Sequence, residues 1–226
     1  WKEKRVKYIK KYITDLVVLF PFEISWYHKR NIKVHYFGHP LIDLYRKKTT
    51  ENNKVCVGLF VGSRKQEINN HMPVIKEVVK LLQQKISNIF FIIGSLKNER
   101  LNIAKDLGLK NNYKIIYDSF NAFDESDVAI VASGTATLEC AITKTPFVVI
   151  YKTSFLSWFI TRFFVKIKFA SIVNILANKL IVKECLQKEC NSKKITNCLL
   201  NLINKDNKTL FENFEKVINP LGDGTA

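Results

Sequence analysis

The sequence lacks the features that mark disulfide-rich, metal-binding or membrane-spanning proteins. Its five cysteines form no CxxC pair, and its four histidines lie outside any metal-ligand spacing. We therefore expect reduced thiols, no metal and no cofactor. No uninterrupted apolar run reaches the roughly 18 residues of a spanning helix. The only methionine is Met72, so Trp1 is not a normal translation start, and we expect a fragment of a longer protein.

Acidic residues are also scarce. There are 36 Lys and Arg against 20 Asp and Glu, which gives a formal net charge of +16 at pH 7. This excess predicts an anionic partner such as a nucleic acid, an anionic lipid or a phosphorylated small molecule. Nucleic acid is not favoured, because no basic run is interleaved with the stacking aromatic residues of a known module. The composition is also rich in Lys, Asn and Ile, which weakens charge as a functional signal.

Apolar residues make up 47% of the chain, enough for a substantial core. From Lys54 onwards, short apolar runs alternate with helical patterns, an order typical of parallel strands with helices on both faces. We therefore predict an α/β fold with a Rossmann-like, doubly wound parallel sheet. The expected strands are 55–61, 89–94, 113–118, 128–132 and 146–151, and the expected helices between them are 65–86, 98–108, 120–125 and 135–143.

Changes of composition along the chain predict four parts. A polar stretch with Gly and Pro separates two apolar regions, as expected where one domain gives way to the next. Before it, short apolar runs at 15–20 and 32–37 flank a helix opened by Pro21, which is a β-α-β pattern. The four parts are a β-α-β region (1–38), an interdomain linker (39–53), the Rossmann-like domain (54–190), and C-terminal helices with a flexible tail (191–226).

Two strand-to-helix junctions have the composition of a phosphate site. Ligands of open parallel sheets bind at the carboxyl ends of the strands. At the first junction, Gly62 and Ser63 would expose backbone amides at a helix start, and Arg64 adds a fixed cation. The second junction, "ASGTATLE" (132–139), leaves a buried strand through small residues that would let a diphosphate approach the backbone. Ordinary helix capping explains either junction alone, but the occurrence of both on one predicted sheet favours a binding site.

Neither junction carries the GxGxxG fingerprint or a Walker loop, so nicotinamide cofactors and phosphate-hydrolysing switches are disfavoured. The interpretation that remains is nucleotide-sugar chemistry. Glu139, one turn into its helix, is expected to orient neighbouring groups or to place favourable charge near a helix start. The candidate residues of the two junctions are Gly62, Ser63, Arg64, Glu67, Ser133, Gly134, Thr135, Ala136 and Glu139.

A third stretch combines aromatic residues with positive charge. Residues 152–183 contain six cations and no acidic residue. Within it, residues 155–169 place aromatic side chains on more than one helix face, a pattern that resembles an interfacial membrane helix. A helix packed between two domains explains the same pattern, and the two interpretations stay open. The expected membrane-facing residues are Trp158, Phe159, Arg162, Phe163, Phe164, Lys166 and Lys168.

Several stretches together resemble the lipid-A-disaccharide synthase family of glycosyltransferases. They follow one another at fitting intervals over most of the chain, although SGT-type loops also occur in related nucleotide-sugar enzymes. Val61 and Val173 depart from the family pattern, because proline is usual at both positions, and this affects loop rigidity more than chemistry. The stretches are "VLFPFE" (18–23), "FGHPL" (37–41), "GSRKQEI" (62–68), "ASGTATLECA" (132–141), "PFVVIY" (146–151), "VNILA" (173–177) and "VKECLQKEC" (182–190).

The resemblance implies the C-terminal half of a GT-B glycosyltransferase plus the last elements of its N-terminal domain. Residues 1–38 would then be those last elements of an N-terminal Rossmann-like domain, and residues 54–190 would be the nucleotide-sugar (UDP) binding Rossmann-like domain. The implied reaction is inverting transfer of 2,3-diacylglucosamine from its UDP donor to the 6-hydroxyl of 2,3-diacylglucosamine 1-phosphate, without a metal. The implied location is cytoplasmic and peripheral on the inner membrane, at an anionic surface, with a homodimer as one option. The general base would lie in the N-terminal domain, so we expect no catalytic residue here and a chain that binds UDP without catalysing transfer.

The resemblance also implies roles for individual residues. Ser63, Arg64 and the SGT loop would hold the diphosphate, Asn174 would line the donor site, and Glu184 with Gln187 would hold the ribose. Two alternatives stay open. A UDP-N-acetylglucosamine epimerase-like enzyme would share the phosphate loops but would not need lipid, and a non-catalytic membrane-docking module would need no nucleotide.

Overall fold

The computed structural model describes residues 4–47, 54–94, 100–153 and 168–222. The chain forms two compact units. Unit 1 consists of Trp1–Tyr45 together with Lys216–Ala226, and unit 2 consists of Arg46–Glu215. The assignment of these parts to an N-terminal domain, a linker and a nucleotide-sugar domain stays a prediction.

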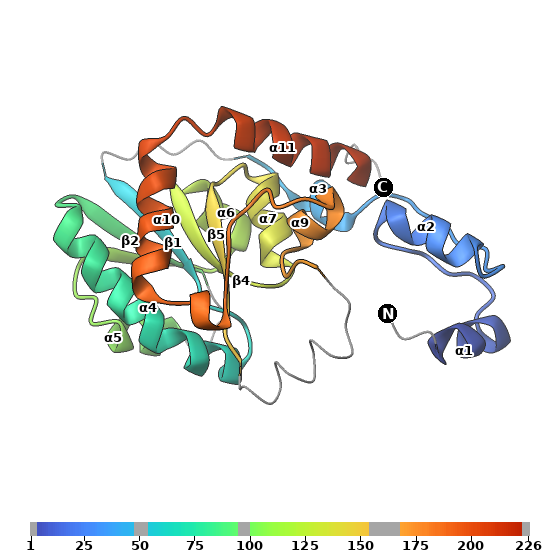
Figure 1. The fold of residues 1–226 in the computed structure, drawn as a ribbon, viewed down its shortest axis with the longest axis horizontal. Helices are drawn as coiled ribbons and strands as arrows, with labels where there is room; N and C mark the ends of the chain where they lie inside the picture. The colour runs from blue at the N-terminus through green and yellow to red at the C-terminus, as the bar shows by residue number, and fades with distance from the viewer. Residues whose placement is uncertain (1–3, 48–53, 95–99, 154–167, 223–226) are drawn as a thin grey trace. The chain divides into compact units, whose positions relative to one another are not determined.

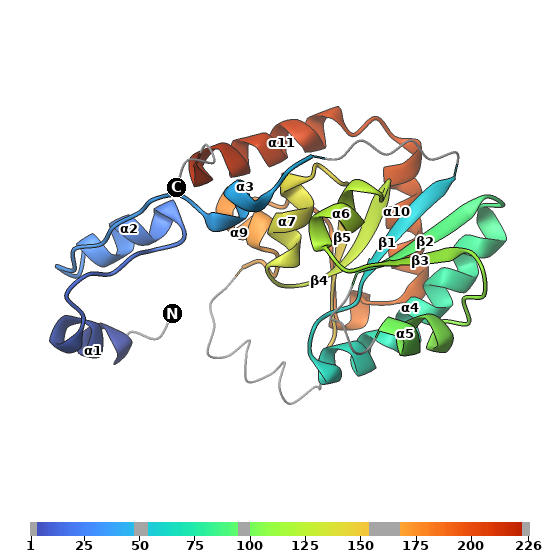
Figure 2. The same ribbon diagram turned by 180° about the vertical axis from the view of Figure 1, so that it is seen from behind.

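Unit 2 is built on a six-stranded parallel sheet with the strand order β3-β2-β1-β4-β5-β6. From β1 the chain moves outwards to β3, and it then returns to the centre to place β4 beside β1 (Figure 2). This order confirms the predicted doubly wound α/β fold. The strands are β1 (Val55–Phe60), β2 (Ile89–Gly94), β3 (Tyr113–Ile116), β4 (Val128–Ala132), β5 (Phe147–Tyr151) and β6 (Glu184–Leu186).

Helices cover both faces of this sheet. Figure 1 shows α4 and α10 in front of the strands, and Figure 2 shows α6 and α7 on the opposite face. On the first face α5 packs beside α4, and on the second α9 packs against α7. The bounds are α4 (Lys65–Lys85), α5 (Arg100–Asp106), α6 (Ser119–Asp124), α7 (Ala136–Ile142), α9 (Ile172–Ala177), η1 (Gln187–Glu189), α10 (Ser192–Asn204) and α11 (Lys208–Ile218), the last of which continues into unit 1.

The core lies between the sheet and these helices. Every residue of β4 is buried, as expected for a central strand of a parallel sheet that has helices on both faces. The apolar face of α4 is buried against the sheet because its apolar residues recur every three or four positions. The ring of Phe60 stacks on Phe123 with centroids 3.8 Å apart. Gly94 makes room for this pair, because a Cβ atom there would overlap the Phe60 ring.

Unit 1 contains α1 (Lys4–Tyr12), α2 (Pro21–His28), α3 (Pro40–Leu44) and η2 (Asn219–Leu221). The two strands predicted at 15–20 and 32–37 do not form a ladder. They meet in a single parallel bridge between Val17 and His35. Two short strands with no third neighbour are marginal, which accounts for the difference. The expected linker also contains α3, which begins at a proline, as helices often do.

The motif "VLFPFE" is explained by local structure in unit 1. Pro21 occupies the first turn of α2, where its missing N–H costs nothing. Glu23 folds back over that turn, and its carboxylate accepts hydrogen bonds from the amides of Leu19 (3.2 Å) and Phe20 (3.1 Å). The glutamate therefore caps the start of α2, and these two hydrogen bonds give a structural reason for a glutamate at this position.

Candidate functional site

A crevice with a volume of about 350 Å³ opens at the carboxyl ends of β1 and β4. These strands are neighbours, but the helices that follow them, α4 and α7, lie on opposite faces of the sheet. The two connecting loops therefore run in opposite directions and leave a crevice between them. This arrangement is a topological switch point, the place where open α/β sheets bind ligands. The residues that line the crevice are Phe60, Gly62, Ser63, Glu67, Gly94, Ile116, Tyr117, Ser119, Ala132, Ser133, Gly134, Thr135, Ala136 and Glu139.

The structure brings together eight of the nine residues predicted at the two junctions, and the exception is Arg64. Sequence reasoning missed five lining residues from the ends of β1 to β3 and the start of α6: Phe60, Gly94, Ile116, Tyr117 and Ser119. The strand order would have found them. Once β2 and β3 are placed beside β1, their carboxyl ends must lie at the same edge of the sheet as those of β1 and β4.

Neither helix that starts at the crevice is capped by its own N-cap side chain. The N-cap residue is Arg64 for α4 and Thr135 for α7, and neither side chain makes a capping hydrogen bond. The amides of residues 134–136 donate to no acceptor among the described residues. Unpaired amides and the positive end of a helix dipole both favour an anion at this position. The backbone therefore supplies the positive character of the crevice.

Glycine geometry keeps the second junction open. Gly134 has φ +154°, and a Cβ atom added there would meet nothing within 4 Å. Gly62 has φ +120° at the first junction, again a conformation that favours glycine. Ser133 lines the crevice, but its hydroxyl donates to the carbonyl oxygen of Ala170 at 2.7 Å. This serine side chain therefore ties the loop to the start of α9.

Arg64 points its guanidinium at a carboxylate. Its Nη1 donates to Oε1 of Glu67 at 2.8 Å, and 81% of its side chain is exposed against 20% for Glu67. An ion pair this exposed contributes little to stability. The pair instead neutralises a carboxylate that lines the crevice and holds a cation at its rim.

Glu139 is the second carboxylate of the crevice. Burial raises the pKa of the Glu139 carboxyl, a hydrogen bond with Ser119 opposes this shift, and the negative charge of Asp118 adds to it. The three groups come from α7 and from the start of α6 on the same face of the sheet. Glu139 and Ser119 together present an acceptor and a hydroxyl to the crevice, which suits a ligand that carries hydroxyl groups.

Asn174 and Glu184 do not line the crevice. The carboxylate of Glu184 accepts hydrogen bonds from the amides of residues 170–171 at 2.9–3.1 Å and from Nδ2 of Asn174 at 2.8 Å. The Asn174 amide also donates to the carbonyl oxygen of Val182 and accepts from the amides of Ile181 and Val182. The two side chains join α9 to β6, and we call this pair the α9–β6 clamp.

The remaining predicted residues lie apart from the crevice or outside the described residues. Gln187 begins η1 with φ +49°, and its buried Nε2 has no hydrogen-bond partner in the described part of the chain. Lys168 is exposed, with Nζ 5.5 Å from the centroid of the Phe169 ring. The six other residues predicted to face a membrane lie outside the described residues: Trp158, Phe159, Arg162, Phe163, Phe164 and Lys166.

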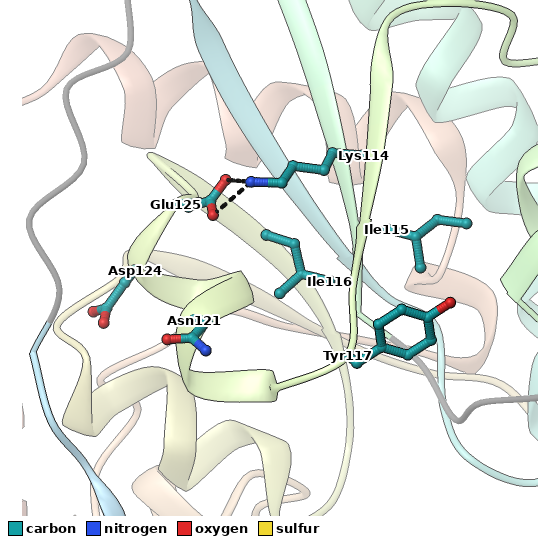
Figure 3. A pocket seen from close by; sticks show the side chains of 7 residues that line it. All are labelled: Lys114, Ile115, Ile116, Tyr117, Asn121, Asp124 and Glu125. Atoms are coloured by element: carbon teal, nitrogen blue, oxygen red, sulfur yellow. Dashed lines mark hydrogen bonds and ion pairs between the residues drawn. The ribbon is translucent and has the colours of Figure 1, made fainter.

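A smaller hollow of about 240 Å³ lies between β3 and α6 (Figure 3). The ammonium group of Lys114 lies 2.8 Å from both carboxylate oxygens of Glu125, so the charges at this hollow pair with each other. Figure 3 shows Ile116 on the side of this pair and Ile115 on the other side of the strand, the normal alternation along β3. The hollow is smaller than the crevice, lies at the sheet edge away from the switch point, and has no uncapped loop.

The described residues show no metal-binding or membrane-spanning arrangement. No group of three or more His, Cys, Asp or Glu side chains there has a metal-binding arrangement, and no described helix is long and apolar enough to cross a membrane. All five cysteines are free thiols. Burial raises the pKa of Cys56, Cys140 and Cys190, and that of Cys185 to about 12, so these thiols are poor nucleophiles.

Sequence comparisons agree in pointing to one family. The sequence profile of lipid-A-disaccharide synthetase matches residues 1–219. Lipid-A-disaccharide synthase 1 of Legionella pneumophila (strain Lens) is 32% identical over 234 residues, covering 98% of this chain and 60% of its own length. The synthase of Sulfurihydrogenibium sp. (strain YO3AOP1) is 33% identical over 250 residues, covering 98% and 64% respectively. The chain thus spans slightly over three fifths of the length of these curated relatives.

Solved structures resemble this chain in fold. A structure of S. aureus MnaA with UDP has a TM-score of 0.59 and 17% identity, covering 92% of this chain and 55% of that one. A putative UDP-N-acetylglucosamine 2-epimerase from Listeria monocytogenes has a TM-score of 0.54 and 16% identity, covering 84% and 50%. At this level of identity, the likeness concerns the chain path alone.

Proposed function

The chain belongs to the lipid-A-disaccharide synthetase family, and we propose that unit 2 binds the UDP part of a sugar nucleotide in the crevice at β1 and β4. One observation carries this proposal: two helix N-termini without side-chain caps meet at the switch point of a doubly wound sheet. A diphosphate is the ligand group that best matches several free amides at such a place. The S. aureus MnaA protein, which has a similar fold, was solved together with UDP, and this is compatible support.

The diphosphate lies against the two loops. The amides of residues 134–136 and the start of α4 donate to its oxygens, and Arg64 at the rim turns from Glu67 to the phosphate. A phosphate oxygen competes well for the guanidinium, because its charge is concentrated and the ion pair with Glu67 is exposed. The same groups stabilise the negative charge that develops on UDP as the glycosidic bond breaks.

The nucleoside lies deeper, towards β2 and β3. Glu139 and Ser119 hydrogen-bond the ribose hydroxyls, and the base packs near Tyr117 and Ile116, where the lining is apolar or aromatic. Glu139 is preferred to Glu184 for the ribose, because both Glu184 oxygens already accept hydrogen bonds within the α9–β6 clamp. This arrangement follows the usual composition of small-molecule sites, which combine an apolar lining with a few placed polar groups.

For the whole protein we propose the reaction that the relatives' name describes. A 2,3-diacylglucosamine group passes from its UDP donor to the 6-hydroxyl of 2,3-diacylglucosamine 1-phosphate, with inversion at the anomeric carbon. Within that reaction we assign unit 2 the donor nucleotide, and we assign the general base to the N-terminal domain by analogy with the family.

Both proposed substrates carry acyl chains, so we further propose that residues 155–169 hold the protein against an anionic bilayer. Each cation near the surface contributes about 1 kcal/mol of attraction. Binding to anionic vesicles should weaken as salt screens this attraction, and Phe163→Ser with Phe164→Ser should weaken it at every salt concentration. Sedimentation with liposomes measures this, and a protein that stays in the supernatant at low salt contradicts membrane attachment.

Titration calorimetry with UDP, UMP and uridine tests the nucleotide site. UDP should bind more tightly than UMP and UMP more tightly than uridine, because each phosphate adds charge-assisted contacts. UDP should also raise the melting temperature, since it binds only the folded state. Absence of UDP binding at millimolar concentration would overturn the proposal. Equal affinity for UDP-N-acetylglucosamine and its acylated counterpart would favour an epimerase-like enzyme.

A further inference from the structure

His71 is a buried imidazole that the proposed function does not use. It lies about two turns into α4 and is 0% exposed. Its Nδ1 lies 2.7 Å from the carbonyl oxygen of Val61, and its Nε2 lies 3.0 Å from the amide nitrogen of Lys152. A carbonyl only accepts and an amide N–H only donates, so Nδ1 must carry the proton and Nε2 must accept. The geometry therefore specifies one neutral tautomer.

The two partners of His71 are backbone groups at the ends of two strands. Val61 directly follows β1 and precedes Gly62 of the first crevice loop, and Lys152 directly follows β5. Because β4 lies between β1 and β5 in the sheet, the imidazole joins strand ends that have no direct hydrogen bonds with each other. The start of the first crevice loop is thus fixed by a side chain rather than by the ladder.

The planar peptide unit makes this contact relevant to the crevice. The Val61 carbonyl and the Gly62 N–H belong to one trans peptide and point in opposite directions. Fixing the carbonyl on His71 therefore fixes the Gly62 N–H on the far side of the loop. Gly62 lines the crevice, and its amide donates to no acceptor among the described residues. The Gly62 N–H is thus available to a ligand, and the contact between His71 and the Val61 carbonyl sets the direction in which it points.

We propose that His71 is a positioning residue for nucleotide binding: its neutral imidazole, anchored on Lys152, orients the Val61–Gly62 peptide so that the Gly62 amide faces the ligand. This inference rests on the proposed function of the crevice. Protonation of Nε2 would place two donors face to face, so the imidazole would move away from Lys152 and its bond to the Val61 carbonyl would be displaced with it. Nucleotide affinity then depends on the neutral state of a group that never touches the nucleotide.

The surroundings of His71 favour that neutral state. Burial lowers the pKa of His71; the hydrogen bond to Val61 and the charge of Glu67 on the same helix oppose this, and the charge of Lys152 at the end of β5 adds to it. The Cys190 thiol, which follows η1, also lies near Lys152 and is uncharged, because burial raises its pKa. The imidazole is therefore neutral at physiological pH and becomes charged only in acid.

Two substitutions separate positioning from simple packing. His71→Asn keeps an amide donor near the place of Nδ1 and so keeps the Val61 bond, whereas His71→Leu fills the space without either bond. We expect His71→Leu to weaken UDP binding about tenfold, and His71→Asn to stay within about threefold of the wild type. Thr145→Val serves as the matched control. It removes another buried hydrogen bond, from Thr145 to the Phe123 carbonyl, at the opposite end of β5 and should leave UDP affinity unchanged.

A pH profile of UDP affinity provides the readout that packing alone would not move. The affinity of the wild type should fall in acid more steeply than that of His71→Asn, which cannot titrate; titration of the UDP phosphate and of Glu139 affects both proteins and cancels in the comparison. Parallel profiles, or equal losses in His71→Asn and His71→Leu, would overturn the inference. A wild type that binds no UDP would instead overturn the proposed function, and the inference with it.

Discussion

The crevice and the α9–β6 clamp use similar polar residues in opposite ways. In the clamp, Asn174 and Glu184 accept or donate at almost every available position, with partners at 2.8–3.1 Å. In the crevice, the amides of residues 134–136 lack acceptors among the described residues, and both helix starts lack side-chain caps. A saturated polar cluster stabilises a fold, whereas an unsaturated one keeps its hydrogen-bonding capacity for a ligand.

The clamp is expected to show the largest effect on stability. Asn174→Ala removes four hydrogen bonds and leaves the amides of the half-buried Ile181 and the buried Val182 without their acceptor. Each stranded group costs about 1–3 kcal/mol, so we expect the free energy of unfolding to fall by about 3 kcal/mol or more. Urea denaturation measures it, with exposed Thr135→Ala in the crevice as the control. A stable Asn174→Ala variant that no longer binds UDP would show that Asn174 contacts the ligand. It would contradict the distinction between a structural clamp and a binding crevice.

The crevice should respond in binding rather than in stability. Arg64→Ala removes one charge-assisted phosphate contact, so UDP affinity should fall about tenfold or more. The free energy of unfolding should hardly change, because the Arg64–Glu67 ion pair is exposed. Calorimetry on Arg64→Ala and the charge-conserving Arg64→Lys measures the first effect, and urea denaturation measures the second. An unchanged UDP affinity in Arg64→Ala would remove this arginine from the site.

A related change should improve binding. Glu67→Gln abolishes the ion pair that occupies Arg64 and removes a negative charge from the lining of the crevice. UDP affinity should rise about two- to fivefold, because a weak surface ion pair no longer competes with the phosphate. The double variant with Arg64→Ala is the control, since most of the gain should vanish in it. A loss of affinity in Glu67→Gln would mean that the glutamate orients Arg64 towards the ligand.

The sequence predicted the sheet well, because its central strands are continuous apolar runs. Residues 89–94 and 128–132 form strands with the predicted bounds, and the loops that follow β1 and β4 meet at the crevice. Short elements such as α9 and β6 carry too few residues for a periodic signal, and they were not predicted. The partners of Asn174 and Glu184 are set by that unpredicted α9–β6 packing. Composition alone therefore did not distinguish a clamp from a ligand contact.

The smallest effect is expected from replacing a glutamate by glutamine, at Glu139 in the crevice and at Glu184 in the α9–β6 clamp. Burial raises the pKa of Glu139, so between its ordinary and its raised pKa the folded state binds more protons than the unfolded state. Stability is therefore lost as pH rises through this window and stays lower at neutral pH. Glu139→Gln removes that loss and should be slightly more stable than the wild type at neutral pH. The difference should disappear below about pH 4, where both states are protonated.

Glu184→Gln is the matched variant, and it should have the opposite sign. It places an NH₂ group among donors that now point at a carboxylate, so it should lower stability. Thermal melts of both variants from about pH 3 to pH 8, with and without UDP, measure the pair. Glu139→Gln should gain stability and lose UDP affinity together, because the same partly buried carboxylate that lowers the stability of the fold accepts the ribose hydroxyls. If Glu139→Gln is destabilised like Glu184→Gln, Glu139 is part of the scaffold, and the ribose must be held by other groups.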